Sequence, residues 1–160
     1  MHLNTHFNCT GVMKNLFSKQ LSLCVCILLS ATPASGGSQA RPSRLAPCPD
    51  SPNCVSSLSD NKKHFIEPFD FRGSREEVRQ KLINILKSTR RVRLVKVETD
   101  FIHAEFRSFL FRFVDDVAFY FPSEETIIHV RSASRTGYYD FGANRRRVER
   151  LRSAFENQTK

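Results

Sequence analysis

Long hydrophobic runs are missing from this sequence of 160 residues, and cysteine and acidic side chains are few. The apolar stretch Leu21–Leu29 has nine residues. A helix that crosses a membrane needs about 20, so this stretch is too short to span one. No internal repeat and no second domain can be recognised, and the length suits a single domain with an N-terminal extension.

The apolar stretch does fit a secretory signal peptide, which has a basic start, a short apolar region and small residues at its cleavage site. Lys14 and Lys19 precede the stretch, and small residues follow it up to Gly36. We therefore expect residues 1–34 to be a signal peptide, with cleavage after Ala34 or Gly36. The protein would then be exported to the periplasm or the extracellular space.

Alternatives for this N-terminal segment remain open. The first twelve residues contain no Lys or Arg, so Met13 is a candidate for the true start. Lipid attached to Cys24 or Cys26 would make the protein a lipoprotein, but Leu23 and Val25 stand where a small residue is needed. The segment could also be a buried helix, although it shows neither polar periodicity nor a helix cap.

Only two cysteines, Cys48 and Cys54, lie outside residues 1–34. In an exported protein, a pair at this spacing with prolines between its members predicts a disulfide. Closing so short a loop should stabilise the fold by about 2 kcal/mol. Free thiols, metal binding and redox activity are the alternatives. A zinc site usually takes four ligands and a redox pair is normally Cys-x-x-Cys, so we expect no metal and no cofactor.

Basic residues outnumber acidic ones, with 25 Lys and Arg against 16 Asp and Glu. Residues 1–34 hold two of the basic and none of the acidic residues, so the remaining 126 residues carry a net charge of about +7. This balance favours anionic partners such as polysaccharide, phospholipid headgroups or nucleic acid. Arg145–Arg147 lacks interleaved aromatic residues, and we expect an anionic envelope ligand or a protein partner rather than nucleic acid. A charge that only keeps the protein soluble is the competing interpretation.

Periodicity predicts a helix, four strands and a second helix. Ser74 and Glu77 form a capping box ahead of apolar residues at helical spacing, which predicts a helix over 75–89. A second apolar stripe predicts a helix over 143–156. Between the helices, alternating apolar and polar residues predict strands at about 92–98, 100–108, 111–121 and 125–133.

This order of elements predicts an α+β fold, in which an antiparallel sheet of four to five strands carries two helices on one face. The segment His64–Phe71 alternates around a proline and fits an edge strand or an extended arm. Residues 35–47 are expected to form a flexible leader, and residues 48–157 the single domain.

Alternation along the strands also assigns side chains to the two faces of the sheet. Phe111 and Phe113 have the parity of the apolar face and are expected to point inward. Asp115 has the same parity, so it is either turned outward by a bulge or is a buried acid with a partner. The opposite face would carry many polar groups: His103, Glu105, Arg107, Arg112, Asp116, Tyr120, His129 and Arg131.

The candidate catalytic groups do not converge in this assignment. Asp115 and Asp116 project to opposite faces, so we expect them to pair with nearby arginines rather than to form a catalytic dyad. His129 and Ser132 also lie on opposite faces, which argues against a Ser-His hydrolase. A polar network through Asp140, Asn144 and Arg147 is expected instead to attach the fourth strand to the second helix.

Five motifs in a fixed order resemble one known family. They are Cys48–Ser57, Ile102–Phe106, Phe113–Val117, Ile128–Arg135 and Gly137–Arg145. In this order they resemble the domain-of-unknown-function family 1499. The residues that fall on its motifs are Cys48, Cys54, Asp115, Asp116, Arg131, Ser132, Ser134, Arg135, Asp140 and Asn144.

The resemblance implies a small exported or lipid-anchored bacterial protein with relatives in chloroplasts. It implies no activity, and it carries no catalytic role to any residue. Ala118 departs from the pattern, because an acidic residue is expected after Asp115-Asp116-Val117. A model that requires an acidic cluster at this position is therefore weakened.

Together these observations favour a non-enzymatic exported domain that binds a ligand or partner in the cell envelope. The alternative is a hydrolase-like enzyme that uses Asp115 or Asp116 with His129 and Arg131. A purely structural envelope protein is a third hypothesis. The candidate ligand-binding residues are Asp115, Asp116, His129, Arg131, Ser132, Ser134, Arg135, Asp140 and Asn144.

Overall fold

The computed structural model describes residues 44–157, and the predicted signal peptide and most of the leader lie outside these residues. Six strands and two helices follow one another along the described chain. They are β1 (Cys54–Ser56), β2 (Phe69–Asp70), α1 (Arg75–Ser88), β3 (Val92–Val97), β4 (Phe101–Arg107), β5 (Val114–Tyr120), β6 (Ile127–Ser134) and α2 (Ala143–Asn157).

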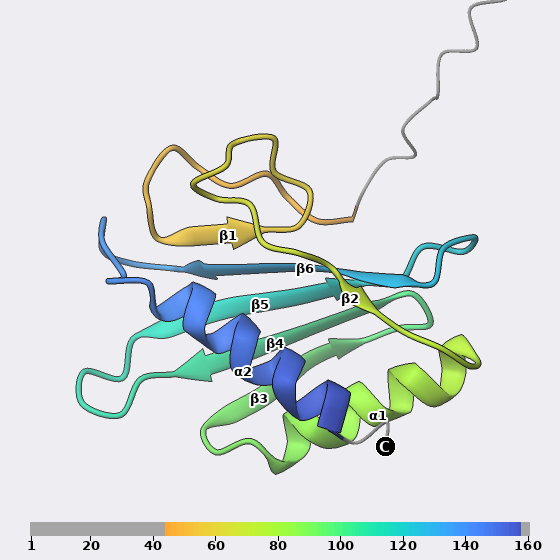
Figure 1. Ribbon diagram of the computed structural model, residues 1–160. Helices are drawn as coiled ribbons and strands as arrows, with labels where there is room; N and C mark the ends of the chain where they lie inside the picture. Colours follow the sequence, from red (N-terminus) through yellow and green to blue (C-terminus); the bar gives the residue numbers. More distant parts are fainter. Residues whose placement is uncertain (1–43, 158–160) are drawn as a thin grey trace, which may run out of the picture. The chain divides into compact units, whose positions relative to one another are not determined.

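The strands form an antiparallel sheet in the order β1-β6-β5-β4-β3, and β2 pairs with β6 beyond the end of β1. Both helices lie on the same face of the sheet (Figure 1). The predicted α+β fold is therefore confirmed, with six strands rather than four to five. Strand β2 lies within His64–Phe71, the segment expected to be an edge strand or an extended arm, whereas β1 has three residues, which is too short for alternation to reveal it.

Each helix begins at a side chain that caps its first turn. The Ser74 hydroxyl accepts a hydrogen bond from the Glu77 amide, and the Ser74 amide donates to the Glu77 carboxylate, as the capping box predicts. At α2, the Asp140 carboxylate accepts hydrogen bonds from the amides of Gly142 at 2.9 Å and Asn144 at 2.8 Å. The sequence thus fixes where both helices start.

The hydrophobic core lies between the helices and the inner face of the sheet. Leu82 and Leu86 of α1 and Val148 of α2 are fully buried there. Phe69 of β2 meets Phe119 of β5 edge to face, with ring centroids 6.0 Å apart, so the short strand β2 also seals the core.

Phe111 and Phe113 do not point into this core, and the prediction of their direction was wrong. Their exposed fractions are 68% and 53%. Strand β5 begins at Val114, because a hairpin loop closes before it. The Ser108 amide donates to the Phe113 carbonyl and the Phe113 amide to the Ser108 hydroxyl, both at 2.9 Å. Apolar side chains therefore occupy the tip of the β4–β5 hairpin.

A disulfide joins Cys48 to Cys54, as predicted. The described end of the leader, from Arg44 on, is folded rather than loose. Arg44 pairs with the carboxylates of Glu98 and Asp100, and Leu45 is buried. These residues therefore belong to the folded unit.

Candidate functional site

The candidate residues fall into two groups, one on each face of the sheet. Some point toward the helices and form one buried network, and others lie on the opposite face. The network contains Asp115, Ser132, Ser134, Asp140 and Asn144. The opposite face and its margin carry Asp116, His129, Arg131 and Arg135.

The buried network is built around an ion pair between Asp115 of β5 and Arg147 of α2, whose side chains are 8% and 11% exposed. Asp115 is thus a buried acid with a partner, one of the two alternatives that the sequence left open. Arg147 also donates to the Ser132 hydroxyl at 3.0 Å and to the Asn144 side-chain oxygen at 2.6 Å. Burial lowers the pKa of the Arg147 guanidinium, and the charge of Asp115 opposes this change.

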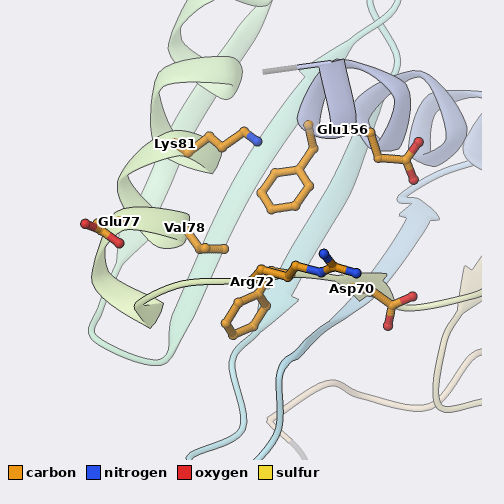
Figure 2. Close-up of a pocket in the computed structure, with 8 residues that line it drawn as sticks. Asp70, Arg72, Glu77, Val78, Lys81 and Glu156 are labelled. Atoms are coloured by element: carbon orange, nitrogen blue, oxygen red, sulfur yellow. The ribbon is translucent and has the colours of Figure 1, made fainter. Parts of the chain in front are cut away.

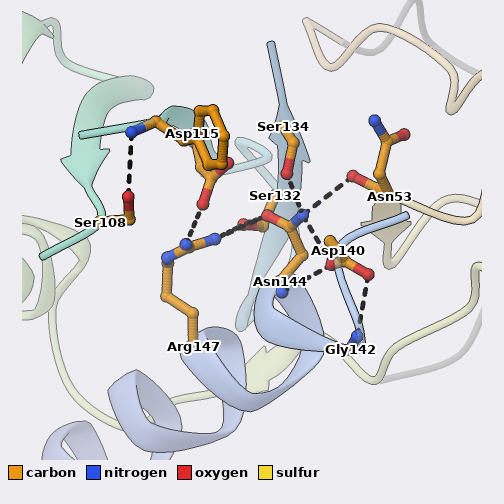
Figure 3. Close-up of polar contacts among 10 residues, drawn as sticks. Asn53, Ser108, Asp115, Ser132, Ser134, Asp140, Gly142, Asn144 and Arg147 are labelled. Carbon is orange, nitrogen blue, oxygen red and sulfur yellow. Dashed lines mark hydrogen bonds and ion pairs between the residues drawn. The ribbon is translucent and has the colours of Figure 1, made fainter. Parts of the chain in front are cut away.

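Asn144 is completely buried and connects three segments of the chain. Its side-chain nitrogen shares its two hydrogens among three acceptors: the Asn53 carbonyl, the Ser134 hydroxyl and the Asp140 carboxylate (Figure 3). Burial would raise the pKa of Asp140, but hydrogen bonds from Asn144 and Gly142 hold it below its ordinary value. The predicted attachment of the fourth long strand to the second helix is confirmed.

Asn53 is a member of this network that the sequence analysis missed. Its carbonyl also accepts the Ser134 amide at 3.0 Å, and its side-chain nitrogen donates to the Gly137 carbonyl. Asn53 stands next to Cys54, so the disulfide loop holds it in place. Its place within a motif of the resembled family was the one signal that could have indicated it.

The charges on the opposite face of the sheet largely neutralise one another. Arg135 donates to Asp116 at 2.7 Å and to Glu105 at 2.6 Å, and Asp116 also pairs with His103 at 2.7 Å. Burial would raise the pKa of Asp116, but Arg135 and His103 lower it below its usual value. Arg135 and Arg93 lower the pKa of Glu105. This part of the face is paired within itself and offers little free charge.

Ser57, His129 and Glu125 lie in the order of a catalytic triad but lack its properties. The Ser57 hydroxyl is 3.1 Å from His129 Nδ1, and His129 Nε2 is 3.9 Å from Glu125. Ser57 is 8% exposed, and its hydroxyl accepts the Val130 amide at 2.9 Å. A buried hydroxyl that is held by the backbone suits a structural role better than attack on a substrate.

The residues of the hydrolase alternative lie on both faces of the sheet. Asp115 pairs with Arg147 on the inner side, whereas His129 and Arg131 lie on the outer side. Asp116 shares that outer side, but Arg135 and His103 already occupy its carboxylate oxygens.

Unpaired positive charge gathers instead at a pocket of about 500 Å³ beside α2. Its walls come from the end of α1, the turn before β3, the end of β4 and α2. Its lining residues include no acidic side chain and five arginines: Arg90, Arg91, Arg107, Arg147 and Arg150. Except for Arg147, these arginines form no ion pair within residues 44–157.

A second hollow of about 440 Å³ continues this pocket toward the edge strand β3. The two share Arg91, Arg107, Ser108 and Phe109, and the second adds the arginines Arg93 and Arg112. This arginine-lined pocket leaves no pattern in the sequence, because its arginines come from separate segments that each resemble a solvated surface.

A family described as "Protein of unknown function (DUF1499)" matches residues 44–155. The chain belongs to this family. No match was found among curated proteins or among solved structures.

A further pocket of the DUF1499 domain, of about 530 Å³, lies between the start of α1 and the end of α2 (Figure 2). Its charges have both signs, since Asp70, Glu77 and Glu156 accompany Arg72 and Lys81. Burial lowers the pKa of Lys81. Mixed charge gives this pocket no clear preference for an anion or a cation.

Two further properties follow from residues 44–157 of the DUF1499 domain. Within this range, no group of three or more His, Cys, Asp or Glu side chains is placed to hold a metal ion. Neither of its helices has the length and apolar character needed to cross a membrane.

Proposed function

We propose that this DUF1499 domain is a non-enzymatic, exported binding domain of the cell envelope, whose ligand is a phosphate-bearing anion held in the arginine-lined pocket. The observation that carries the proposal is the convergence of five arginines around one pocket without an acidic lining residue. Arginine presents several N–H donors in a planar fork, which matches the oxygens of phosphate.

Electrostatics in the pocket favour an anion. Arg147 and Arg150 repel one another, and this repulsion adds to burial in lowering the pKa of Arg147. Asp115 neutralises only one of the positive charges around the pocket. A bound phosphate would remove the remaining repulsion, whereas a cation would increase it.

The buried network prepares Arg147 for such a ligand. Asp115, Ser132 and Asn144 fix its guanidinium from the protein side, while its other side lines the pocket. A group that is held in advance loses little conformational entropy on binding. We therefore assign these predicted ligand-binding residues a positioning role that acts through Arg147.

The chemistry of the pocket supports binding rather than catalysis. General acid-base catalysis needs a titratable group within reach of the substrate. The lining contains no Asp, Glu, His or Cys. Its hydroxyl groups, on Thr89 and Ser108, have no base among the lining residues.

Export is the second part of the proposal. It is supported by the signal-peptide pattern of residues 1–34 and by the disulfide between Cys48 and Cys54, since disulfides persist in oxidising compartments. In the envelope, phosphate-bearing anions are available as free compounds and as parts of larger molecules.

Thermal unfolding with pyrophosphate as the probe tests the binding proposal. A ligand that binds only the folded state raises the melting temperature. We expect such a rise for the parent protein and a much smaller one for the double variant Arg107→Gln/Arg150→Gln. Both side chains are exposed and form no ion pair in the described chain, so the variant should fold.

The matched control is Arg72→Gln, which removes an exposed arginine that lines the mixed-charge pocket. It should retain the full rise in melting temperature. An equal rise in the parent protein and the double variant would show that pyrophosphate binds elsewhere and would refute the arginine-lined pocket as its site.

A further inference from the structure

Large exposed apolar side chains gather in two loops of the domain. Ten such side chains are exposed among the described residues, and seven of them belong to the β4–β5 loop or to the connection between β6 and α2. Their exposed fractions range from 53% to 88%. The seven are Phe109, Leu110, Phe111, Phe113, Tyr138, Tyr139 and Phe141.

The two loops lie at the same end of the sheet. Strands β5 and β6 are antiparallel neighbours, so the start of β5 lies beside the end of β6. The Arg135 amide donates to the Val114 carbonyl at 3.1 Å and ties the two loops together at their bases. Figure 1 shows both connections at the left end of the sheet, where the turn from α1 to β3 also lies.

The backbone at this end adopts costly conformations. Three non-glycine residues of the described chain have a left-handed backbone: Arg91, Arg112 and Phe141, with φ of 60°, 53° and 51°. Such a conformation costs about 1 kcal/mol or more for a residue with a side chain. Phe141 is also 88% exposed, so no packing compensates for its strain. A strained backbone at an exposed phenylalanine is consistent with a side chain that contacts a binding partner.

Arginines surround the exposed aromatic rings. The guanidinium of Arg91 lies 5.1 Å from the ring centre of Phe109. Arg107 precedes the apolar loop and lines both arginine-lined hollows, and Arg112 lies between Phe111 and Phe113 and lines the second hollow. Apolar side chains at loop tips with basic side chains behind them are typical of a surface that inserts into an anionic bilayer.

We propose that this end of the domain docks on a membrane that contains anionic phospholipids, and that the arginine-lined pocket takes a phospholipid headgroup phosphate. The two aromatic loops would enter the interface between headgroups and acyl chains, where phenylalanine is buried and tyrosine keeps its hydroxyl in water. This inference rests on the proposed function and specifies its ligand as a lipid headgroup.

The positive charge of this docking patch, meaning the exposed apolar side chains of the two loops with the arginines beside them, favours a membrane over a second copy of the chain as its partner. A symmetric dimer would place the same surface on both sides of its interface. The arginines of one copy would then face those of the other without acidic partners, which is unfavourable. An anionic bilayer instead has negatively charged headgroups above an apolar interior. It therefore complements both the arginines and the exposed apolar side chains of the patch.

Sedimentation of the exported protein, without the predicted signal peptide of residues 1–34, with lipid vesicles tests the inference. Vesicles of phosphatidylcholine alone are compared with vesicles that also contain phosphatidylglycerol. We expect binding only to the anionic vesicles, and a loss of at least about tenfold in affinity for the variant Leu110→Ser/Phe111→Ser, because each of these exposed side chains would bury apolar area in the bilayer. The control Leu58→Ser removes an exposed apolar side chain from the segment after β1 and should bind as the parent does.

Phe141→Asn supplies a second test with an independent stability readout. Asparagine tolerates the left-handed backbone, so this variant should be at least as stable as the parent while binding anionic vesicles more weakly. Stability that falls together with vesicle binding would contradict the assignment of Phe141 to the docking surface.

The remaining outcomes separate this inference from the proposed function. The loop variants should keep the pyrophosphate-induced rise in melting temperature, whereas Arg107→Gln/Arg150→Gln should lose both that rise and vesicle binding. If pyrophosphate raises the melting temperature of the parent protein but the protein does not bind anionic vesicles, only the membrane inference is overturned. Equal vesicle binding by parent and loop variants would assign the binding to another segment, and self-association abolished by the loop variants would assign the patch to a second copy. Either result would overturn the inference.

Discussion

Asp115 of β5 and Arg147 of α2 form an ion pair that is almost completely buried, with exposed side-chain fractions of 8% and 11%. This pair connects the inner face of the sheet to the second helix and also places Arg147 at the arginine-lined pocket. Removing one member of a buried pair leaves the other charge without compensation.

Asp115→Asn should therefore destabilise the fold by about 3 kcal/mol, because Arg147 would remain buried without a counter-charge. Urea unfolding measures this change. The neighbouring variant Asp116→Asn is a matched control, since the Asp116 side chain is 28% exposed and should cost less. A larger loss of stability for Asp116→Asn than for Asp115→Asn would contradict this ranking.

Opening the disulfide should weaken the fold without abolishing it. Cys48→Ser removes the bond that closes the loop to Cys54, and the chain-entropy model gives a loss of about 2 kcal/mol. Cys48 is the better position to change because Cys54 is 1% exposed. The melting temperature should fall in the variant. An unchanged melting temperature would refute a stabilising role for the disulfide.

His129 should make the fold sensitive to mild acid. Burial lowers its pKa, and Glu125 only partly opposes this. In the unfolded chain a histidine takes up a proton near pH 6.5. The unfolded state therefore gains the proton first as the pH falls below about 6.5, and stability is lost until the folded-state pKa is reached.

His129→Asn should reduce this loss, because asparagine does not titrate and its side-chain oxygen can replace Nδ1 as the partner of Ser57. Urea unfolding of both proteins at a series of pH values measures the difference. Parallel curves between pH 7 and 5 would show that other groups cause the acid sensitivity.

If the protein is exported, its intact mass should show cleavage of the signal peptide and formation of the disulfide. The chain produced in a bacterial host with its own N-terminal segment should lose residues up to Ala34 or Gly36. The product should also be two hydrogens lighter than its reduced form because of the Cys48–Cys54 bond. Intact mass spectrometry measures both. An uncut, reduced chain would refute export, and an added lipid would support the lipoprotein alternative.

The secondary structure was predictable where a regular pattern of apolar residues extends over a long segment. Strands β4 and β6 and both helices carry enough alternating or helical positions for a sequence pattern to reveal them. The pattern failed at Phe111 and Phe113, which continue the alternation of β5 although a hairpin loop holds them outside the strand. Alternation alone does not show where pairing ends.

The site was less predictable, for a physical reason. Asp140 and Asn144 stand in a motif and act locally at the start of α2, so their network could be inferred. Arg90, Arg107 and Arg150 come from the end of α1, from β4 and from α2, and only the packing of these elements brings them together. Single arginines in separate segments give no signal that they converge.

The central claim is that the arginine-lined pocket binds a phosphate-bearing anion. NMR spectra of the arginine Nε–Hε groups during a pyrophosphate titration test it most directly, because each arginine reports for itself. The account predicts saturable shifts for Arg107, Arg147 and Arg150 and none for Arg72, which lines the mixed-charge pocket. Equal small shifts for all four arginines, or none at saturating pyrophosphate, would contradict the claim.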